Sequence, residues 1–353
     1  MRRAGALVFA VMTAWGADTW NREAGEMAAK SPMVQDAKAF LVEQAKTISD
    51  AHVRAATVDA LGSQTCVAHR AGLTRVNKQA ILDGLVTAGL VERSDRLMAG
   101  VFPPVANEES ACPKLPQAFD AAPGGEFGGH HSYPGGLAVH ECFNLRSSLN
   151  LMGLYQKQYD PNLLLDRDLL VAAPIWHDWA KTLVFQWNVD GTEFAEFTMA
   201  GTGAHHVLGL AETMKRKLPV DEVLTQASAH AAPVLGNEPR VVNWIRAAAI
   251  IAGVDPFAEG YLRKDENGQM HLAHYRPEFS IHNLSDADFV VSIPAMAAAD
   301  SLLKQLAPEF GFSPDDRARY NTSYRNPVLT RVPAERLQMI RSAREEVRRV
   351  VPR

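Results

Sequence analysis

Five successive segments between residues 130 and 257 repeat apolar residues every three or four positions. That period is typical of α-helices that bury one face and leave the other in water. The segments cover residues 134–159, 166–183, 204–218, a stretch from Asp221 past His230, and 239–254. We therefore expect a mostly α fold with its core over 130–257.

The chain before this core has two parts of different composition. Residues 17–101 show the helical period again, most clearly at 36–48 and 76–90, and predict an N-terminal helical region. Residues 102–129 are rich in Pro, Gly and Ala, which predicts a long loop that leads into the core.

Two β-hairpins are predicted within and after the helices. Residues 183–188 and 193–199 alternate apolar and polar positions around Asp190-Gly191, a strong turn signal. A second hairpin around Asn267-Gly268 opens a C-terminal region, 258–353, that we expect to pack on the core. The rest of this region contains two predicted helices, near 294–306 and 333–350.

Residues 1–16 resemble a secretory signal peptide. A basic start at Arg2-Arg3 precedes an apolar run over 4–14 and a small residue at Gly16. The protein is expected outside the cytoplasm if this leader is cut, and in the cytoplasm otherwise. The run is shorter than the roughly 20 residues that a membrane-spanning helix needs, and we predict no transmembrane segment.

The charge balance limits the classes of partner. The chain has 36 basic and 40 acidic residues and a net charge of −4, so no excess of cations could neutralise a nucleic-acid backbone. Its three cysteines cannot all pair; Cys66 and Cys112 could bridge in an exported protein, but their spacing does not decide it.

Histidines are concentrated in the predicted core. Seven of the twelve in the chain lie between residues 130 and 230, which suggests metal binding. The pair His177-Asp178 suits a site for two ions, because the carboxylate can bridge both while the imidazole binds one. Lys181 follows His177 by four residues on the same helical face, where its ammonium could hold a phosphate oxygen.

Each of the other core helices offers one further candidate ligand. The candidates, in chain order, are His140, His205 or His206, His230 and Asp255. Imidazole and carboxylate together suit divalent cations such as Mn, Fe, Ni or Zn.

The stretch from His130 to His140, HHSYPGGLAVH, followed by His177-Asp178-x-x-Lys181, resembles the HD superfamily of metal-dependent phosphohydrolases. These two motifs are similar to those of HD-type 3′–5′ exoribonucleases and of HD domains associated with relaxases. The likeness covers about a third of the chain, roughly 130–257. It implies an HD-type helical bundle with one or two inserted hairpins.

The resemblance also implies roles for particular residues. A first divalent cation would be ligated by His140, His177, Asp178 and Asp255, and Asp178 would bridge to a second cation. Mg²⁺ is a further candidate for the identity of these ions. His206 or His205, with His230, would hold that second cation. We favour His206, because its helical face continues through Leu210 and Met214, whereas that of His205 continues to Glu212 and Arg216. His131 would approach the substrate or orient another side chain.

Three features depart from the family pattern. Pro174 replaces an apolar residue, Trp179-Ala180 replaces a small apolar pair, and the 183–199 hairpin is an insertion. We expect the hairpin to form a flap over the substrate. Its aromatic residues favour cross-strand and core packing over stacking on a base. They are Phe185, Trp187, Phe194 and Phe197.

The expected function is hydrolysis of a phosphate ester, in a nucleotide or another small phosphorylated metabolite, with Asp178 and Lys181 as catalytic groups. Two alternatives use the same region. An HD-fold di-iron oxygenase similar to myo-inositol oxygenase would need a comparable ligand set. A non-catalytic ligand sensor or scaffold would need no bound metal.

Overall fold

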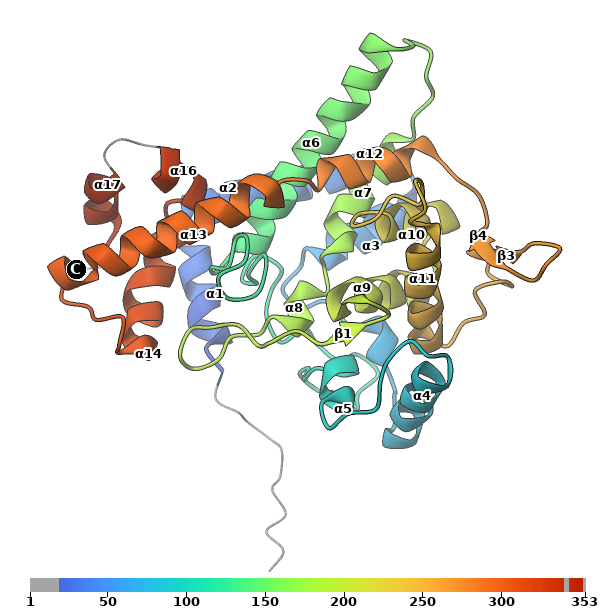
Figure 1. The fold of residues 1–353 in the computed structure, drawn as a ribbon, viewed down its shortest axis with the longest axis horizontal. Coiled ribbons are helices and arrows are strands. Elements are labelled where there is room, and N and C mark those ends of the chain that lie inside the picture. Colours follow the sequence, from blue (N-terminus) through green and yellow to red (C-terminus); the bar gives the residue numbers. More distant parts are fainter. Residues whose placement is uncertain (1–18, 340–342, 352–353) are drawn as a thin grey trace, which may run out of the picture.

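The computed structural model describes residues 19–339 and 343–351, and its regular structure is almost entirely helical (Figure 1). The prediction of a mostly α fold is confirmed. The candidate signal peptide, residues 1–16, lies outside the described residues. The helices are α1 (Asn21–Ala29), α2 (Pro32–Ala45), α3 (Ala51–Ala60), η1 (Ala68–Arg70), α4 (Arg75–Thr87), α5 (Leu97–Val101), α6 (Gly136–Gln158), α7 (Arg167–His177), α8 (Lys181–Val184), α9 (Ala204–Lys215), α10 (Val220–Ala227), α11 (Glu238–Ala252), α12 (Pro277–Ser285), α13 (Phe289–Leu306), η2 (Ala307–Phe310), α14 (Arg317–Tyr320), the π-helical turn η3 (Asn321–Arg325), α15 (Asn326–Leu329), α16 (Ala334–Met339) and α17 (Ala343–Val350). The strands are β1 (Thr198–Met199), β2 (Thr202–Gly203), β3 (Leu262–Lys264) and β4 (Met270–Leu272).

Short polar side chains fix where several helices begin. The Ser31 hydroxyl accepts a hydrogen bond from the Val34 amide at the start of α2, and Thr74 with Asn77 forms a capping box at the start of α4. The Asp166 carboxylate caps α7 by accepting from the Asp168 amide. These caps define the predicted N-terminal helices and the first turn of the helix that leads to the His-Asp pair.

The central helices form a buried bundle in which α6 packs on α2 and α7, and α9 packs on α11. Two of them end earlier than predicted. Helix α7 stops at His177, where the chain turns through Asp178 before α8 starts at Lys181. Helix α10 stops at Ala227, so His230 lies on the turn that follows. Asp178 and His230 therefore follow the ends of these helices and are not part of a regular helical face.

One predicted hairpin forms and the other forms over a shorter stretch. Strands β3 and β4 pair antiparallel, Leu262 opposite Leu272, around the expected turn. Around Gly191 the bridge between Trp187 and Glu193 is flanked by backbone hydrogen bonds from Asn188 to Thr192 and from Phe194 to Gln186, and α8 occupies the first two residues of the predicted strand. The intervening Val184 and Gln186 are buried as well as Leu183, Phe185 and Trp187, so both faces of this run lie inside the core instead of alternating between core and solvent.

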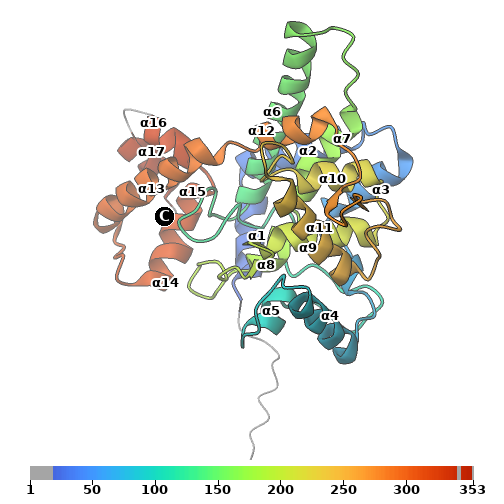
Figure 2. The ribbon, with the colours of Figure 1, turned by 45° about the vertical axis from the view of Figure 1, so that its right-hand side comes forward.

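The C-terminal helices have an apolar cluster of their own. Helices α13 to α17 lie together beside the main core (Figures 1 and 2). They bury side chains such as Leu303 and Val328 together with Tyr133. Arg325, which is almost fully buried, donates to the carbonyl and hydroxyl of Ser132 and so ties this lobe to the loop that precedes α6. We call helices α13 to α17 the C-terminal lobe.

The stretch from α12 through α13 and η2, which runs from the core into the C-terminal lobe, is long and apolar. Residues 277–310 are long and apolar enough, by length and composition alone, to cross a membrane, although the sequence predicts no such segment. A third of the apolar window is buried in the protein, and core helices of soluble proteins meet the same criterion. The stretch is interrupted between α12 and α13 at residues 286–288.

A disulfide joins Cys66 and Cys112, whose Cα atoms are 5.0 Å apart. Cys142 on α6 is a free thiol. The bridge holds the loop after α3 against the loop that follows α5, where Lys114 also pairs with Cys66 in an isolated bridge. The sequence allowed this pairing of Cys66 with Cys112 but did not decide it, and the structure contains it.

Candidate metal centre

Four histidines and two aspartates meet at one point inside the bundle. They come from α6, the end of α7, the start of α9, the turn after α10 and the break between α12 and α13. They are His140, His177, Asp178, His205, His230 and Asp286. The first five were predicted from the sequence, and the fold brings them together.

Asp178 lies at the centre of this cluster. Its Oδ2 is 3.4 Å from His140 Nε2 and 3.5 Å from His177 Nε2. Its Oδ1 is 3.1 Å from His205 Nε2 and 3.9 Å from His230 Nε2. The two carboxylate oxygens therefore face two different pairs of imidazoles, as a carboxylate that bridges two cations requires.

The predicted ligand Asp255 is not part of the cluster. It is exposed, and its carboxylate accepts hydrogen bonds from the amides of Phe257 and Ala258 in the turn after α11. Asp286 lies at the cluster instead: its Oδ1 is 3.3 Å from Nε2 of both His140 and His177, and its Oδ2 is 3.2 Å from His230 Nε2. The closely spaced His282, Asp286 and Asp288 were the sequence signal for it.

The structure places His205, and not the favoured His206, against Asp178. His205 faces Asp178, whereas the His206 ring packs edge-on against His230 and beside Trp244. The argument assumed that Glu212, on the His205 face, lies in water. Glu212 is fully buried and accepts hydrogen bonds from the backbone amides of Ala68 and His69, from the His69 ring and from the Arg216 guanidinium. His206 still groups with His205 and His230, with ligand atoms within 4.8 Å.

Lys181 and His131 lie beside the cluster. The Lys181 ammonium, 2% exposed, contacts Asp178 Oδ2 and the Gly124 carbonyl. His131 is buried, and its Nε2 is 3.6 Å from Asp288 and 3.7 Å from Glu335. In this structure Lys181 is thus held by Asp178, and His131 faces the carboxylates of the C-terminal lobe.

Neighbouring groups orient the histidines. The Nδ1 of His177 donates to the Pro174 carbonyl, 2.8 Å away, which leaves Nε2 unprotonated toward the cluster in the neutral ring. Glu196 accepts from the His205 amide and, at 2.5 Å, from His205 Nδ1. Such contacts on the second nitrogen fix the tautomer and the ring plane of a metal-ligating histidine.

Buried carboxylates dominate the electrostatics of the cluster. Burial disfavours the charged imidazoles, but Asp178 and its neighbouring carboxylates outweigh it and raise the pKa of His140 to about 9 and that of His177 to about 10. Although burial opposes ionisation, His177 and Lys181 hold the pKa of Asp178 well below its usual range. At neutral pH protons therefore supply the positive charge that a cation would supply.

The donor set fits a divalent cation. His177 Nε2, His205 Nε2 and Asp178 Oδ1 are buried and make no hydrogen bond within the described residues. Ligands placed 2.0–2.1 Å from one ion are separated by about 2.9 Å in an octahedron and about 3.3 Å in a tetrahedron. The imidazole-to-carboxylate separations of 3.3–3.5 Å among His140, His177, Asp178 and Asp286 are close to the tetrahedral value.

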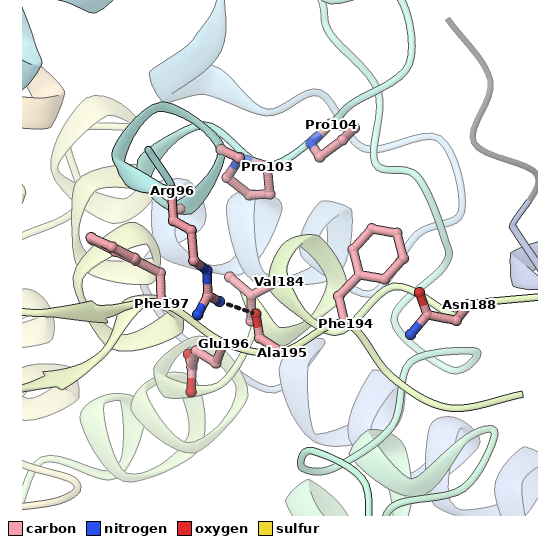
Figure 3. A pocket seen from close by; sticks show the side chains of 11 residues that line it. Arg96, Pro103, Pro104, Val184, Asn188, Phe194, Ala195, Glu196 and Phe197 are labelled. Carbon is pink, nitrogen blue, oxygen red and sulfur yellow. Dashed lines mark hydrogen bonds between the residues drawn. The ribbon is translucent and has the colours of Figure 1, made fainter. Parts of the chain in front are cut away.

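Glu196 also lines a pocket of about 510 Å³ (Figure 3). Phe194 and Phe197 line it, and Arg96 reaches across it to the carbonyl of Ala195. Because Glu196 also holds His205, one residue connects the wall of this pocket to the histidine cluster.

No family model, curated protein or solved structure matches this chain.

Proposed function

We propose that the protein is a metal-dependent phosphohydrolase of the HD type that acts on a small phosphate ester. The observation that supports this most is the central position of Asp178, with each carboxylate oxygen between two histidines. Two divalent cations bound there would supply an activated water and stabilise charge on phosphoryl oxygens.

The residues of the chain have distinct roles in this proposal. His140, His177 and Asp286 hold one cation, His205 and His230 hold the other, and Asp178 contacts both. The Lys181 ammonium contacts Asp178 in this structure, and in the proposal it would bind a non-bridging phosphoryl oxygen of the substrate. The His230 side chain is 32% exposed and forms the open edge through which a substrate would enter.

The pocket beside Glu196 supports a small substrate. Its two phenylalanines and one arginine offer an apolar wall and a cation to the part of the ester that carries the phosphate, and a nucleoside is of suitable size and chemistry. The net charge of −4 does not favour a long polynucleotide.

The test uses protein stripped of metal with a chelator and then supplied with Mn²⁺. We expect hydrolysis of p-nitrophenyl phosphate or bis(p-nitrophenyl) phosphate only when Mn²⁺ is present. Asp178→Asn should lower kcat/KM by about 10³-fold, because several kcal/mol of transition-state stabilisation depend on the cations. Asp255→Asn, an exposed aspartate outside the cluster, is the matched control and should retain full activity.

Other outcomes would replace the proposal. Bound Mn²⁺ without hydrolysis of either ester would contradict it. Purified protein that contains iron and consumes oxygen would support the oxygenase alternative. Failure to bind any divalent cation would support a non-catalytic role.

We also propose that the protein works in an oxidising compartment. The Cys66–Cys112 disulfide supports this, since stable disulfides are rare in proteins of the reducing cytosol. Mass spectrometry of the protein from its native source would show both the bridge and whether residues 1–16 have been removed.

A further inference from the structure

A second group of histidines lies next to the first. His130, His131 and His140 each offer one ring nitrogen, and these three nitrogens lie within 4.8 Å of one another. The Nδ1 atoms of His130 and His131 are 3.4 Å apart, and the rings of His130 and His140 are centred 4.6 Å apart. His140 is therefore at the junction of the two groups.

One nitrogen of His140 is unused by the first group. Nε2 faces Asp178 and Asp286, while Nδ1 is buried and makes no hydrogen bond within the described residues. The His140 side chain is only 2% exposed, so water does not solvate this nitrogen. A buried ring nitrogen without a partner is unfavourable unless a ligand completes it.

His131 has the surroundings of a metal ligand. Its Nδ1 faces His130, while its Nε2 is directed at two carboxylates, Asp288 at 3.6 Å and Glu335 at 3.7 Å. Metal-ligating histidines typically direct the second nitrogen at a carboxylate. Asp288 is the N-cap residue of α13, yet its side chain does not cap the helix.

The backbone around His131 is held in an uncommon conformation. His131 has a φ of +51°, in the left-handed region that residues with a Cβ seldom adopt. Its carbonyl accepts from the Gly124 amide, and a Cβ on Gly136 would lie 1.9 Å from that carbonyl oxygen. The glycine of the sequence motif thus allows the helix start to approach His131 closely.

We propose that His130, His131 and Nδ1 of His140 form an adjoining site for one further divalent transition-metal cation, with Asp288 and Glu335 orienting His131. When both sites are filled, His140 binds as an imidazolate and its ring N–H proton is released to solvent. Three imidazoles are a common ligand set for Zn²⁺ and related ions, and leave a position for water. The neighbouring Lys181 ammonium is in contact with Asp178 and the Gly124 carbonyl, which offset its charge. The site does not depend on phosphate-ester hydrolysis.

The test measures cation stoichiometry in the full chain. Metal-stripped protein is titrated with Zn²⁺ by calorimetry, and bound zinc is measured after gel filtration. His131→Asn is the main variant, because asparagine tolerates a positive φ and so preserves the loop. His130→Asn is the second variant, since His130 is only half-buried and its loss is easily accommodated. His274→Asn, on an exposed histidine that pairs with Asp221, is the matched control.

We expect each of the first two variants to bind one zinc fewer than the wild type and the control. Asp178→Asn should keep the zinc that His131→Asn loses. Equal stoichiometry in wild type, His130→Asn and His131→Asn would overturn the proposal, as would complete loss of zinc from Asp178→Asn. If hydrolysis is absent but the stoichiometry changes as expected, the proposed function fails and this site stands.

Discussion

Glu212 shows how a single charged side chain can be stable inside a helical core. It is fully buried in α9, yet four donors reach its carboxylate, from Ala68, His69 and Arg216. Although burial opposes ionisation, these groups lower the pKa of Glu212 to about 2. A helical-wheel argument assigns every glutamate to the solvent face, and it failed here because the donors come from a distant segment.

This residue predicts a pH dependence of stability. The pKa of Glu212 is lower in the folded chain than its ordinary value of 4.5, so its contribution is complete above that value and is lost as the pH falls toward about 2. Glu212→Gln should lower the free energy of unfolding at pH 7 by about 3 kcal/mol. The difference from wild type should shrink by about 1.4 kcal/mol at pH 3.5. Urea unfolding at the two pH values measures it, with exposed Glu92→Gln as control; a difference that does not change with pH would refute it.

At the scale of elements, the period of apolar residues predicted which segments are helical but not where each helix ends. His230 and Asp178 reach the cluster because α10 and α7 end just before them. Asp286 reaches it from the break between α12 and α13, which follows the segments that the sequence identified as the core. Helical periodicity carries no information on which break faces which helix, so Asp286 was missed as a candidate ligand and the exposed Asp255 was chosen.

Two single variants test whether Asp286, and not Asp255, contributes to cation binding. Asp286→Asn removes charge from oxygens that face His140, His177 and His230, so Mn²⁺ affinity should fall by at least about 100-fold. Asp255→Asn removes only hydrogen bonds to two turn amides and should leave affinity within about twofold. Calorimetric titration of both variants, after circular dichroism has shown that they fold, decides between them. Equal losses would mean that the cluster is not the Mn²⁺ site.

At the scale of the whole molecule, two apolar clusters lie beside one cluster of candidate metal ligands. The main core supplies His140, His177, Asp178, His205 and His230, and the link to the C-terminal lobe supplies Asp286 and Asp288. Composition and local pattern predicted a helical protein with a histidine-rich centre. They could not predict that the lobe has its own apolar cluster, because this depends on contacts between segments nearly two hundred residues apart, such as Arg325 with Ser132.

The disulfide between Cys66 and Cys112 predicts a contribution to the stability of the whole chain. Cys66 and Cys112 are 46 residues apart in sequence, and closing a loop of that length restricts the unfolded chain by about 4 kcal/mol. The Cys66→Ser, Cys112→Ser double variant should therefore unfold at a lower denaturant concentration, with a loss of about 4 kcal/mol in the free energy of unfolding. Cys142→Ser, which removes the free thiol, should change this free energy by less than 1 kcal/mol.

Mn²⁺ affinity should be the same in both variants, because neither of the bridged cysteines contacts the cluster within the described residues. Guanidinium unfolding with and without a reductant measures the first effect. An unchanged unfolding curve on reduction would show that the packing of α3, η1 and α5 alone holds this part of the chain.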